Sequence, residues 1–362
     1  MRILIDGRFF RQKLTGVQRY AIEISQRLVS DPKYYVVVPS AIDKPSEHKD
    51  KYITVPDNWI TPFANTGWSL ISLPSVVAPT DTLWSPVNIG PIQVKRHVVT
   101  VHDLSIYENP QWFSRKFVAG YKLIFPILVR RCSHVVTDSE YSRQGILERF
   151  RLAPDKVSVV YPAASERFRP ADHKDISIVR SKYNLPENYF LSLSSTEPRK
   201  NIGRLLAAWS RLAAESPGEV SLVIAGDRAK TFADPGLKDV VRSAKNVVFT
   251  GYFPDDDLPA LYSGALAFVY PSVFEGFGLP PLEAMACGTP VLCSDATSLP
   301  EVVGGAAFMF SPYDVEAIED ALRHVLVGNL PRDKMRALGL ERARTFSWDK
   351  SARQIANILE SV

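Results

Sequence analysis

Short, continuous runs of β-branched and other apolar residues recur along this chain, and most are followed by segments with helical spacing of apolar residues. In the first half these runs cover residues 3–5, 35–38, 82–84, 98–101, 135–137 and 157–160. In the second half they cover residues 189–193, 222–225, 247–250, 265–270 and 291–293. Strands that helices cover on both faces are apolar throughout, so the pattern predicts parallel sheets in an α/β fold.

A polar stretch at residues 165–177 interrupts this rhythm and is predicted to be a linker. A chain of 362 residues suits two domains of roughly 150 residues each. We therefore expect two Rossmann-like, doubly wound domains, covering residues 1–165 and 178–348, that face each other across a cleft. Ligands of such sheets bind at the carboxyl ends of the strands.

Composition excludes several classes of protein. A net charge of +4 is too balanced for a general nucleic-acid binder. Three cysteines without a CxxC pair argue against a disulfide framework and favour a reducing compartment. The first residues resemble a strand rather than a signal peptide, and no stretch of 18 uncharged apolar residues occurs. We expect a cytoplasmic protein without a membrane span.

The most informative segment is residues 269–290, where a buried run is followed by a glycine-containing loop and then a helical pattern. Gly276 and Gly278 allow the backbone to approach a ligand closely. Pro280 or Pro281 suits the first helical position, and Gly288 suits the end of the helix. The amides and dipole of such a helix start favour an anion, so we predict a diphosphate site.

Two acidic residues bracket this loop. Glu275 precedes it, and Glu283 is predicted to lie in the first turn of the helix. Carboxylates would repel a phosphate, but they can accept hydrogen bonds from hydroxyl groups of a ribose and a sugar on either side of it. The alternative is an ordinary loop in which Glu283 only interacts with the helix dipole.

The spacing of Glu275 and Glu283, with seven residues between them, resembles the E-x7-E motif of retaining GT-B glycosyltransferases of family 4. The resemblance extends over nearly the whole chain. It implies the GT-B fold, with a final helix at residues 349–362 that crosses back to the first domain. It also implies that Glu283 holds the donor ribose and that Glu275 contacts the transferred sugar. The amides of Phe277, Gly278 and Leu279 are implied donor contacts.

Arg199 and Lys200 form a basic pair between a predicted strand and a predicted helix. The guanidinium group can bind two phosphate oxygens, and the ammonium group adds a point charge that would neutralise a departing diphosphate. A solvated helix start is the alternative. Residues 197–201 resemble the family's E-P-R-K-N element, which implies that Arg199 and Lys200 are phosphate ligands. Ser194 and Ser195 stand where the family often has glycine.

Three further residues are candidate ligands. His102 and Asp103 end a predicted strand and resemble the family's V-H-D element, which implies that His102 lies near the transferred sugar; Asp103 is expected to orient it. Gly16 starts a helix capped by Thr15, in a sequence that resembles the family's T-G-x-x-R-Y element, and is expected to approach a phosphate. The backbone near Tyr252 is expected to meet the nucleobase, as in the family.

The acidic triplet at residues 255–257 raises the possibility of a metal site, but it precedes a helical pattern. We interpret the three acids as helix-capping residues. With Arg199, Lys200 and a helix dipole facing the diphosphate, we expect no metal and no other cofactor.

Residues 113–132 combine five basic residues with many aromatic and aliphatic ones. Such a segment can rest on an anionic membrane surface, or it can be a helix packed in its domain with cations at the rim. The sequence leaves both interpretations open.

Together these features predict a retaining, metal-independent hexosyltransferase. The donor is expected to be a nucleotide-diphosphate sugar, of the GDP-mannose type, and the acceptor a lipid-linked saccharide in bacterial polysaccharide or lipopolysaccharide assembly. A nucleotide-sugar 2-epimerase on the same fold and a non-catalytic nucleotide-sugar-binding partner are the alternatives. An NAD enzyme is disfavoured because no G-x-G-x-x-G follows a strand.

Overall fold

The computed structural model describes residues 2–12, 14–42, 48–56, 67–193, 197–215, 220–226, 245–251 and 253–362. The chain forms two compact units. One combines Met1–Pro162 with Ser347–Val362, and the other spans Ala163–Phe346. The first unit thus includes the end of the chain, and the segment that directly follows residue 162 belongs to the second unit.

The first unit is built on a seven-stranded sheet with the order β3-β2-β1-β4-β5-β6-β7, and neighbouring strands run parallel. Its strands are β1 (Ile3–Asp6), β2 (Tyr34–Pro39), β3 (Tyr52–Val55), β4 (Thr82–Ser85), β5 (His97–Val101), β6 (His134–Thr137) and β7 (Val157–Val159). The central strands are buried along their whole length, as the continuous apolar runs predict.

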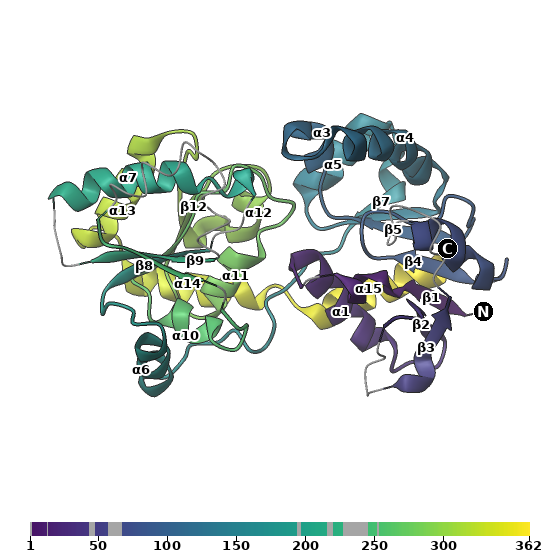
Figure 1. Ribbon diagram of the computed structural model, residues 1–362, viewed down its shortest axis with the longest axis horizontal. Coiled ribbons are helices and arrows are strands. Elements are labelled where there is room, and N and C mark those ends of the chain that lie inside the picture. Colours follow the sequence, from purple (N-terminus) through teal and green to yellow (C-terminus); the bar gives the residue numbers. More distant parts are fainter. Residues whose placement is uncertain are drawn as a thin grey trace. The chain divides into compact units, whose positions relative to one another are not determined.

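Helices connect these strands and pack on the sheet (Figure 1). The α-helices are α1 (Gly16–Leu28), α3 (Ser105–Glu108), α4 (Arg115–Arg131), α5 (Glu140–Phe150) and α15 (Trp348–Ser361). Shorter helical turns are η1 (Gly7–Arg11), η2 (Lys49–Lys51), η3 (Trp68–Ser72), η4 (Leu73–Val76), η5 (Pro110–Trp112) and η6 (Pro154–Lys156). Helix α15, yellow in Figure 1, packs against α1, in purple. At this contact the centroids of the Tyr20 and Trp348 rings are 6.0 Å apart.

The second unit contains a six-stranded sheet of parallel neighbours with the order β10-β9-β8-β11-β12-β13. Its strands are β8 (Tyr189–Leu193), β9 (Ser221–Ala225), β10 (Val247–Gly251), β11 (Ala267–Tyr270), β12 (Val291–Ser294) and β13 (Ala307–Phe310). Strands β8 and β11 are neighbours at the centre of the sheet. The loops that follow them, which carry the basic pair and Glu275, therefore leave the same edge.

The helices of the second unit are α6 (His173–Lys182), α7 (Ile202–Glu215), α10 (Leu258–Ser263), α11 (Leu279–Ala286), α12 (Leu299–Val303), α13 (Val315–Leu326) and α14 (Arg332–Arg344). The described residues of this unit also form the turns η7 (Pro198–Lys200) and η8 (Gly304–Ala306). The predicted apolar face of α7 is buried in one core with residues of the sheet and of α13. The residues of this α7 face are Ile202, Leu205, Leu206, Trp209 and Leu212.

The structure corrects the sequence prediction at three places. The predicted linker at 165–177 contains the first residues of α6, which packs on α10 in the second unit. Two strands were not predicted, namely β3 and β13, and each lies at an edge of its sheet.

Candidate active site

The basic pair of the second unit lies in turn η7, between β8 and α7. Asn201 ends this turn with a positive φ of 55° and is buried. Its amide group donates hydrogen bonds to the carbonyl oxygens of Pro271 (3.0 Å) and Pro312 (2.7 Å). The backbone N–H of Val273 donates to the carbonyl oxygen of Arg199 at 2.8 Å. These hydrogen bonds connect turn η7 to the loop that follows β11, so the backbone of Arg199 and Lys200 is held beside that loop.

Glu275 lies at the centre of this arrangement and is 5% exposed. Its carboxylate accepts hydrogen bonds from Lys200 Nζ (2.8 Å), from the hydroxyl groups of Tyr270 and Ser272 (2.7 Å each), and from the guanidinium group of Arg199. Both cations thus contact one buried carboxylate within a single unit. The predicted proximity of the basic pair and the Glu275 loop is present in the structure.

The charges of this cluster depend on one another. Burial would raise the pKa of Glu275, but Lys200, Arg199 and the hydrogen bonds lower it to about 2. Burial lowers the pKa of Lys200, although Glu275 attracts its charge. Despite its own burial, Arg199 has a raised pKa because Glu275 and Glu197 lie beside it. The carboxylate therefore stays ionised at neutral pH and fixes two cations at the edge of the sheet.

The loop after Glu275 leads directly into α11, whose N-cap is Gly278. Gly278 has a φ of +114°, and a Cβ atom there would lie 2.5 Å from Leu299 Cδ2. Only glycine suits this position, on both conformational and steric grounds. The helix begins at Leu279, and Pro280 and Pro281 supply no N–H groups. Any anion at this helix start would depend on amides of the loop and of Leu279.

Glu283 is buried at 5% exposure and is the fifth residue of α11, so it lies beyond the first turn in which the sequence analysis put it. The reason is that the helix begins at Leu279, one or two residues before the predicted start at Pro280 or Pro281. The Tyr262 hydroxyl donates to its carboxylate at 3.4 Å. A role limited to the dipole of the first turn does not fit this position.

His102 follows β5 in the first unit and is 4% exposed. Its Nδ1 lies 2.6 Å from Asp138 Oδ2, and its Nε2 lies 2.8 Å from the carbonyl oxygen of Pro86. The predicted partner, Asp103, accepts instead from the backbone N–H of Ser105 at 2.8 Å. The orienting acid is therefore Asp138, which follows the neighbouring strand β6. The Pro86 carbonyl oxygen can only accept, so Nε2 donates to it, while Nδ1 pairs with the buried carboxyl group of Asp138.

We expect His102 to hold its proton more tightly than a free imidazole does. Burial would lower its pKa, but the charge and hydrogen bond of Asp138 raise it above the usual value of about 6.5. The stabilisation from this pair is complete below about pH 6.5 and is lost as the pH rises through the raised value. In an NMR titration, Asp138→Asn should lower the pKa of His102. The stability difference between the two proteins should shrink between pH 6 and pH 9, and an unchanged titration would contradict the assignment.

Gly16 is exposed at the first position of α1. Thr15 is the N-cap residue, and the side chain of Gln18 accepts a hydrogen bond from the Thr15 backbone N–H at 3.2 Å. Reciprocal contacts of this kind satisfy N–H groups at a helix start. The predicted nucleobase contact at Tyr252, and Ser194 to Thr196 before the basic pair, lie outside the described residues.

The acidic triplet has protein cations as partners. Asp257 lies 2.6 Å from Lys182 Nζ, and Arg167 lies 3.8 Å from Asp255 and 3.5 Å from Asp256. Asp257 is the N-cap residue of α10, as expected for a capping acid, but its side chain makes no capping hydrogen bond. Among the residues that the structure describes, no group of three or more His, Cys, Asp or Glu side chains is arranged to hold a metal ion.

Comparison with known proteins gives this geometry a context. Residues 174–342 match the family Glycosyl transferases group 1, and residues 14–166 match Glycosyltransferase Family 4. The chain is 32% identical to O-antigen chain mannosyltransferase B of Escherichia coli over 379 residues, which cover 99% of each protein. This chain belongs to glycosyltransferase family 4. As a family member it is an enzyme, a hexosyltransferase with the GT-B fold.

One further relative in sequence and one solved structure are also similar to this glycosyltransferase. It is 37% identical over 231 residues to the serotype-specific mannosyltransferase WbdA of Escherichia coli, covering 61% of this chain and 28% of WbdA. The solved structure of HepE from Anabaena, in complex with UDP, aligns over 100% of both chains with a TM-score of 0.77 at 18% identity. The two parallel sheets are thus the GT-B architecture that the sequence predicted.

Three residues of this candidate site were missed by sequence reasoning. Tyr270 and Ser272 bind Glu275, and Asp138 binds His102. All three directly follow or end a predicted strand, so they come to the carboxyl edge of a sheet with the predicted residues. That placement after strands β6 and β11 was the available signal.

Proposed function

We propose that this glycosyltransferase moves mannose from GDP-mannose to a saccharide acceptor, with retention of configuration and without a metal, in bacterial polysaccharide or lipopolysaccharide assembly. The match over 99% of both chains to an O-antigen chain mannosyltransferase carries the proposal. The fastened cluster of Arg199, Lys200 and Glu275 beside the start of α11 supports it, since two cations and a helix start suit a diphosphate.

In this proposal the second unit binds the donor. Arg199 and Lys200 stabilise the negative charge that develops on the departing nucleoside diphosphate. The amides of Phe277, Gly278 and Leu279 and the backbone at Tyr252 contact the donor, and Glu283 accepts hydrogen bonds from the ribose. Glu275 holds both cations and shares its carboxylate with a hydroxyl of the transferred sugar.

The first unit binds the acceptor and contributes Gly16 and His102. Since both ring nitrogens of His102 already have protein hydrogen-bond partners, His102 has a positioning role here and is not the base that takes the acceptor proton. The acceptor oxygen then bonds to the anomeric carbon on the face from which the phosphate oxygen leaves, and the hydroxyl proton passes to that phosphate. No side-chain nucleophile is required.

A thermal-shift comparison of GDP, UDP, ADP and dTDP tests the donor. Ligand that binds only the folded protein at 100 times its Kd stabilises it by about 2.7 kcal/mol, so the preferred nucleotide should raise the Tm most. We expect GDP to give the largest shift, and GDP-mannose to yield GDP and an extended saccharide. A larger shift with another nucleotide would refute the donor assignment. Release of an epimer without acceptor would favour the epimerase.

We also propose that α4 rests on an anionic membrane where a lipid-linked acceptor is held. One face of α4 is buried in the first unit, through Tyr121, Phe125, Leu128 and Val129. The remainder exposes apolar Phe117 (39%), Leu123 (71%) and Ile127 (41%). Exposed cations flank them, at Arg115, Lys116, Lys122, Arg130 and Arg131. In the described part of the chain, no helix is long and apolar enough to cross a bilayer.

Sedimentation with vesicles tests this contact. We expect binding to phosphatidylglycerol vesicles and little binding to phosphatidylcholine, because cations near an anionic surface contribute about 1 kcal/mol each. Leu123→Glu should weaken binding about tenfold, since a buried leucine contributes about 1.5–3 kcal/mol. Ile178→Glu is the matched control, because Ile178 is 54% exposed on α6 of the second unit. Equal losses in both variants would contradict a specific role for α4.

A further inference from the structure

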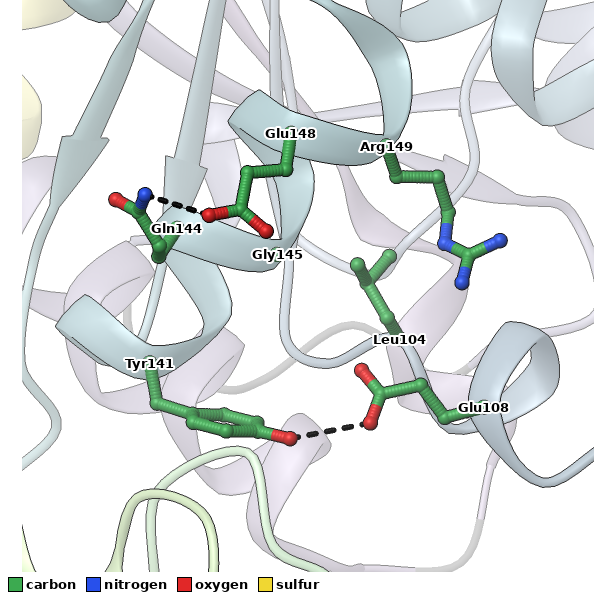
Figure 2. A pocket seen from close by; sticks show the side chains of 7 residues that line it. All are labelled: Leu104, Glu108, Tyr141, Gln144, Gly145, Glu148 and Arg149. Atoms are coloured by element: carbon green, nitrogen blue, oxygen red, sulfur yellow. Dashed lines mark hydrogen bonds between the residues drawn. The ribbon is translucent and has the colours of Figure 1, made fainter.

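A pocket of about 520 Å³ lies in the first unit, between the short helix α3 and helix α5 (Figure 2). Its volume is in the range of about 300–1,000 Å³ that small-molecule sites occupy. Leu104 and Glu108 line it from the side of α3. The other side is one face of α5, with residues at helical spacing, namely Tyr141, Gln144, Gly145, Glu148 and Arg149.

The two helices that form the walls of this pocket begin near the sheet edge that carries His102. Leu104 follows His102 by two residues, and α5 begins two residues after Asp138. The Ser142 hydroxyl of α5 also donates to the carbonyl oxygen of His102 at 3.4 Å. The walls of the pocket are thus joined to the His102–Asp138 pair by short, ordered connections within one unit.

The floor of the pocket is apolar and its walls are polar. Leu104 is 3% exposed, and Gly145 brings the α5 backbone so close that a Cβ atom would lie 3.2 Å from Leu104 Cδ1. Above this floor, the Tyr141 hydroxyl donates to Glu108 at 3.1 Å, as the two side chains point toward each other in Figure 2. Gln144 donates to Glu148 at 2.8 Å. The Tyr141 ring is 38% exposed and offers an apolar surface with a polar tip.

The charged side chains of the pocket walls favour a neutral ligand over an anionic one. Among the residues that line the pocket, Glu108 and Glu148 face one cation, Arg149, whose guanidinium also lies over the Tyr107 ring at 5.1 Å. A phosphate would meet two carboxylates and is disfavoured. A neutral ligand rich in hydroxyl groups can donate to the carboxylates, exchange hydrogen bonds with Gln144 and accept from Arg149. A sugar ring also has an apolar face for Tyr141.

We propose that this pocket is a saccharide subsite, which holds a neutral sugar residue of the acceptor beside the His102 edge. Tyr141 provides the surface on which the sugar rests, and Glu108, Gln144 and Glu148 fix its hydroxyl groups. The assignment rests on the proposed function for the identity of the acceptor. The cavity and its chemistry are independent of the donor.

Binding of mannobiose to the full chain, measured by saturation-transfer NMR without donor, tests the subsite. We expect Tyr141→Ala and Glu148→Gln each to weaken binding at least tenfold. Both positions are exposed, so the variants should fold, and circular dichroism checks this. Tyr313→Ala is the matched control, because Tyr313 is an exposed tyrosine of the second unit at 66%. GDP binding should be unchanged in all three variants.

The outcomes separate this inference from the proposed function. If the wild-type protein does not bind mannobiose, or if Tyr141→Ala and Glu148→Gln bind it as tightly as the control, the subsite is wrong. Transfer from GDP-mannose with an unchanged acceptor KM in Tyr141→Ala would also overturn the subsite while the proposed function stands. The protein could also bind mannobiose, lose that binding in the two variants, and yet fail to use GDP-mannose. That result would support the saccharide subsite and refute the proposed donor.

Discussion

Replacing Lys200 with alanine is expected to lower kcat about 10²–10³-fold, which is the usual cost of removing one group that stabilises a developing negative charge. Lys200 Nζ lies 2.8 Å from Glu275 in a turn that Asn201 fastens to the loop after β11. Its ammonium group is therefore already in place before the reaction and need not be reorganised. The measurement is GDP release from GDP-mannose at saturating donor and acceptor.

The structure offers a matched control for this variant. Lys182 is an exposed lysine of the same unit that also pairs with a carboxylate, at 2.6 Å from Asp257. Lys182→Ala should leave kcat unchanged. In Lys200→Ala, Glu275 keeps Arg199, Tyr270 and Ser272 as partners, so the variant should fold. Near-normal turnover in a folded Lys200→Ala protein would remove Lys200 from the leaving-group site.

Replacing Glu283 with glutamine is expected to weaken GDP binding about 10–100-fold, because a hydrogen bond to a charged group contributes about 1.5–3 kcal/mol. The substitution keeps the volume of a side chain that is 5% exposed, and the amide oxygen can still accept from Tyr262. Loss of affinity then reports on the charge of the carboxylate and not on packing. Calorimetric titration with GDP measures it directly.

A second variant distinguishes ribose binding from a general disturbance of α11. Tyr262→Phe removes the hydroxyl that donates to Glu283 but leaves the carboxylate. We expect a much smaller loss of GDP affinity in this variant. Equal affinity for GDP in Glu283→Gln and the wild-type protein would show that Glu283 does not hold the ribose.

The interior strands could be predicted from the sequence because burial on both faces makes them continuously apolar. The missed strands lie at sheet edges, where one side of the strand is open. In β3 only the first and last of the four residues are buried, and in β13 Met309 is 41% exposed. Such runs are too short and too mixed to be told from loops. Helix α6 was missed because it is mostly polar and buries only Val179, so it has no continuous apolar face.

The sequence could indicate candidate site residues where they are neighbours in the chain, as in the Glu275 loop and the basic pair. It could not indicate them where partners come from different strands. His102 was assigned to the adjacent Asp103, but β5 and β6 are neighbours, so Asp138 comes to the imidazole from 36 residues away. Arg199 and Lys200 can both form ion pairs with Glu275 because β8 and β11, which precede them, are neighbouring strands.

The inclusion of α15 in the first unit has a consequence for biosynthesis. Trp348, Ile355 and Leu359 are buried there, although they follow the entire second unit in the chain. When the ribosome has released the chain as far as residue 162, the first unit still lacks helix α15. This unit can be completed only after residues 163–346 and the helix itself have been translated. Domains commonly fold in the order of their synthesis, but in this protein the later unit can reach completion first.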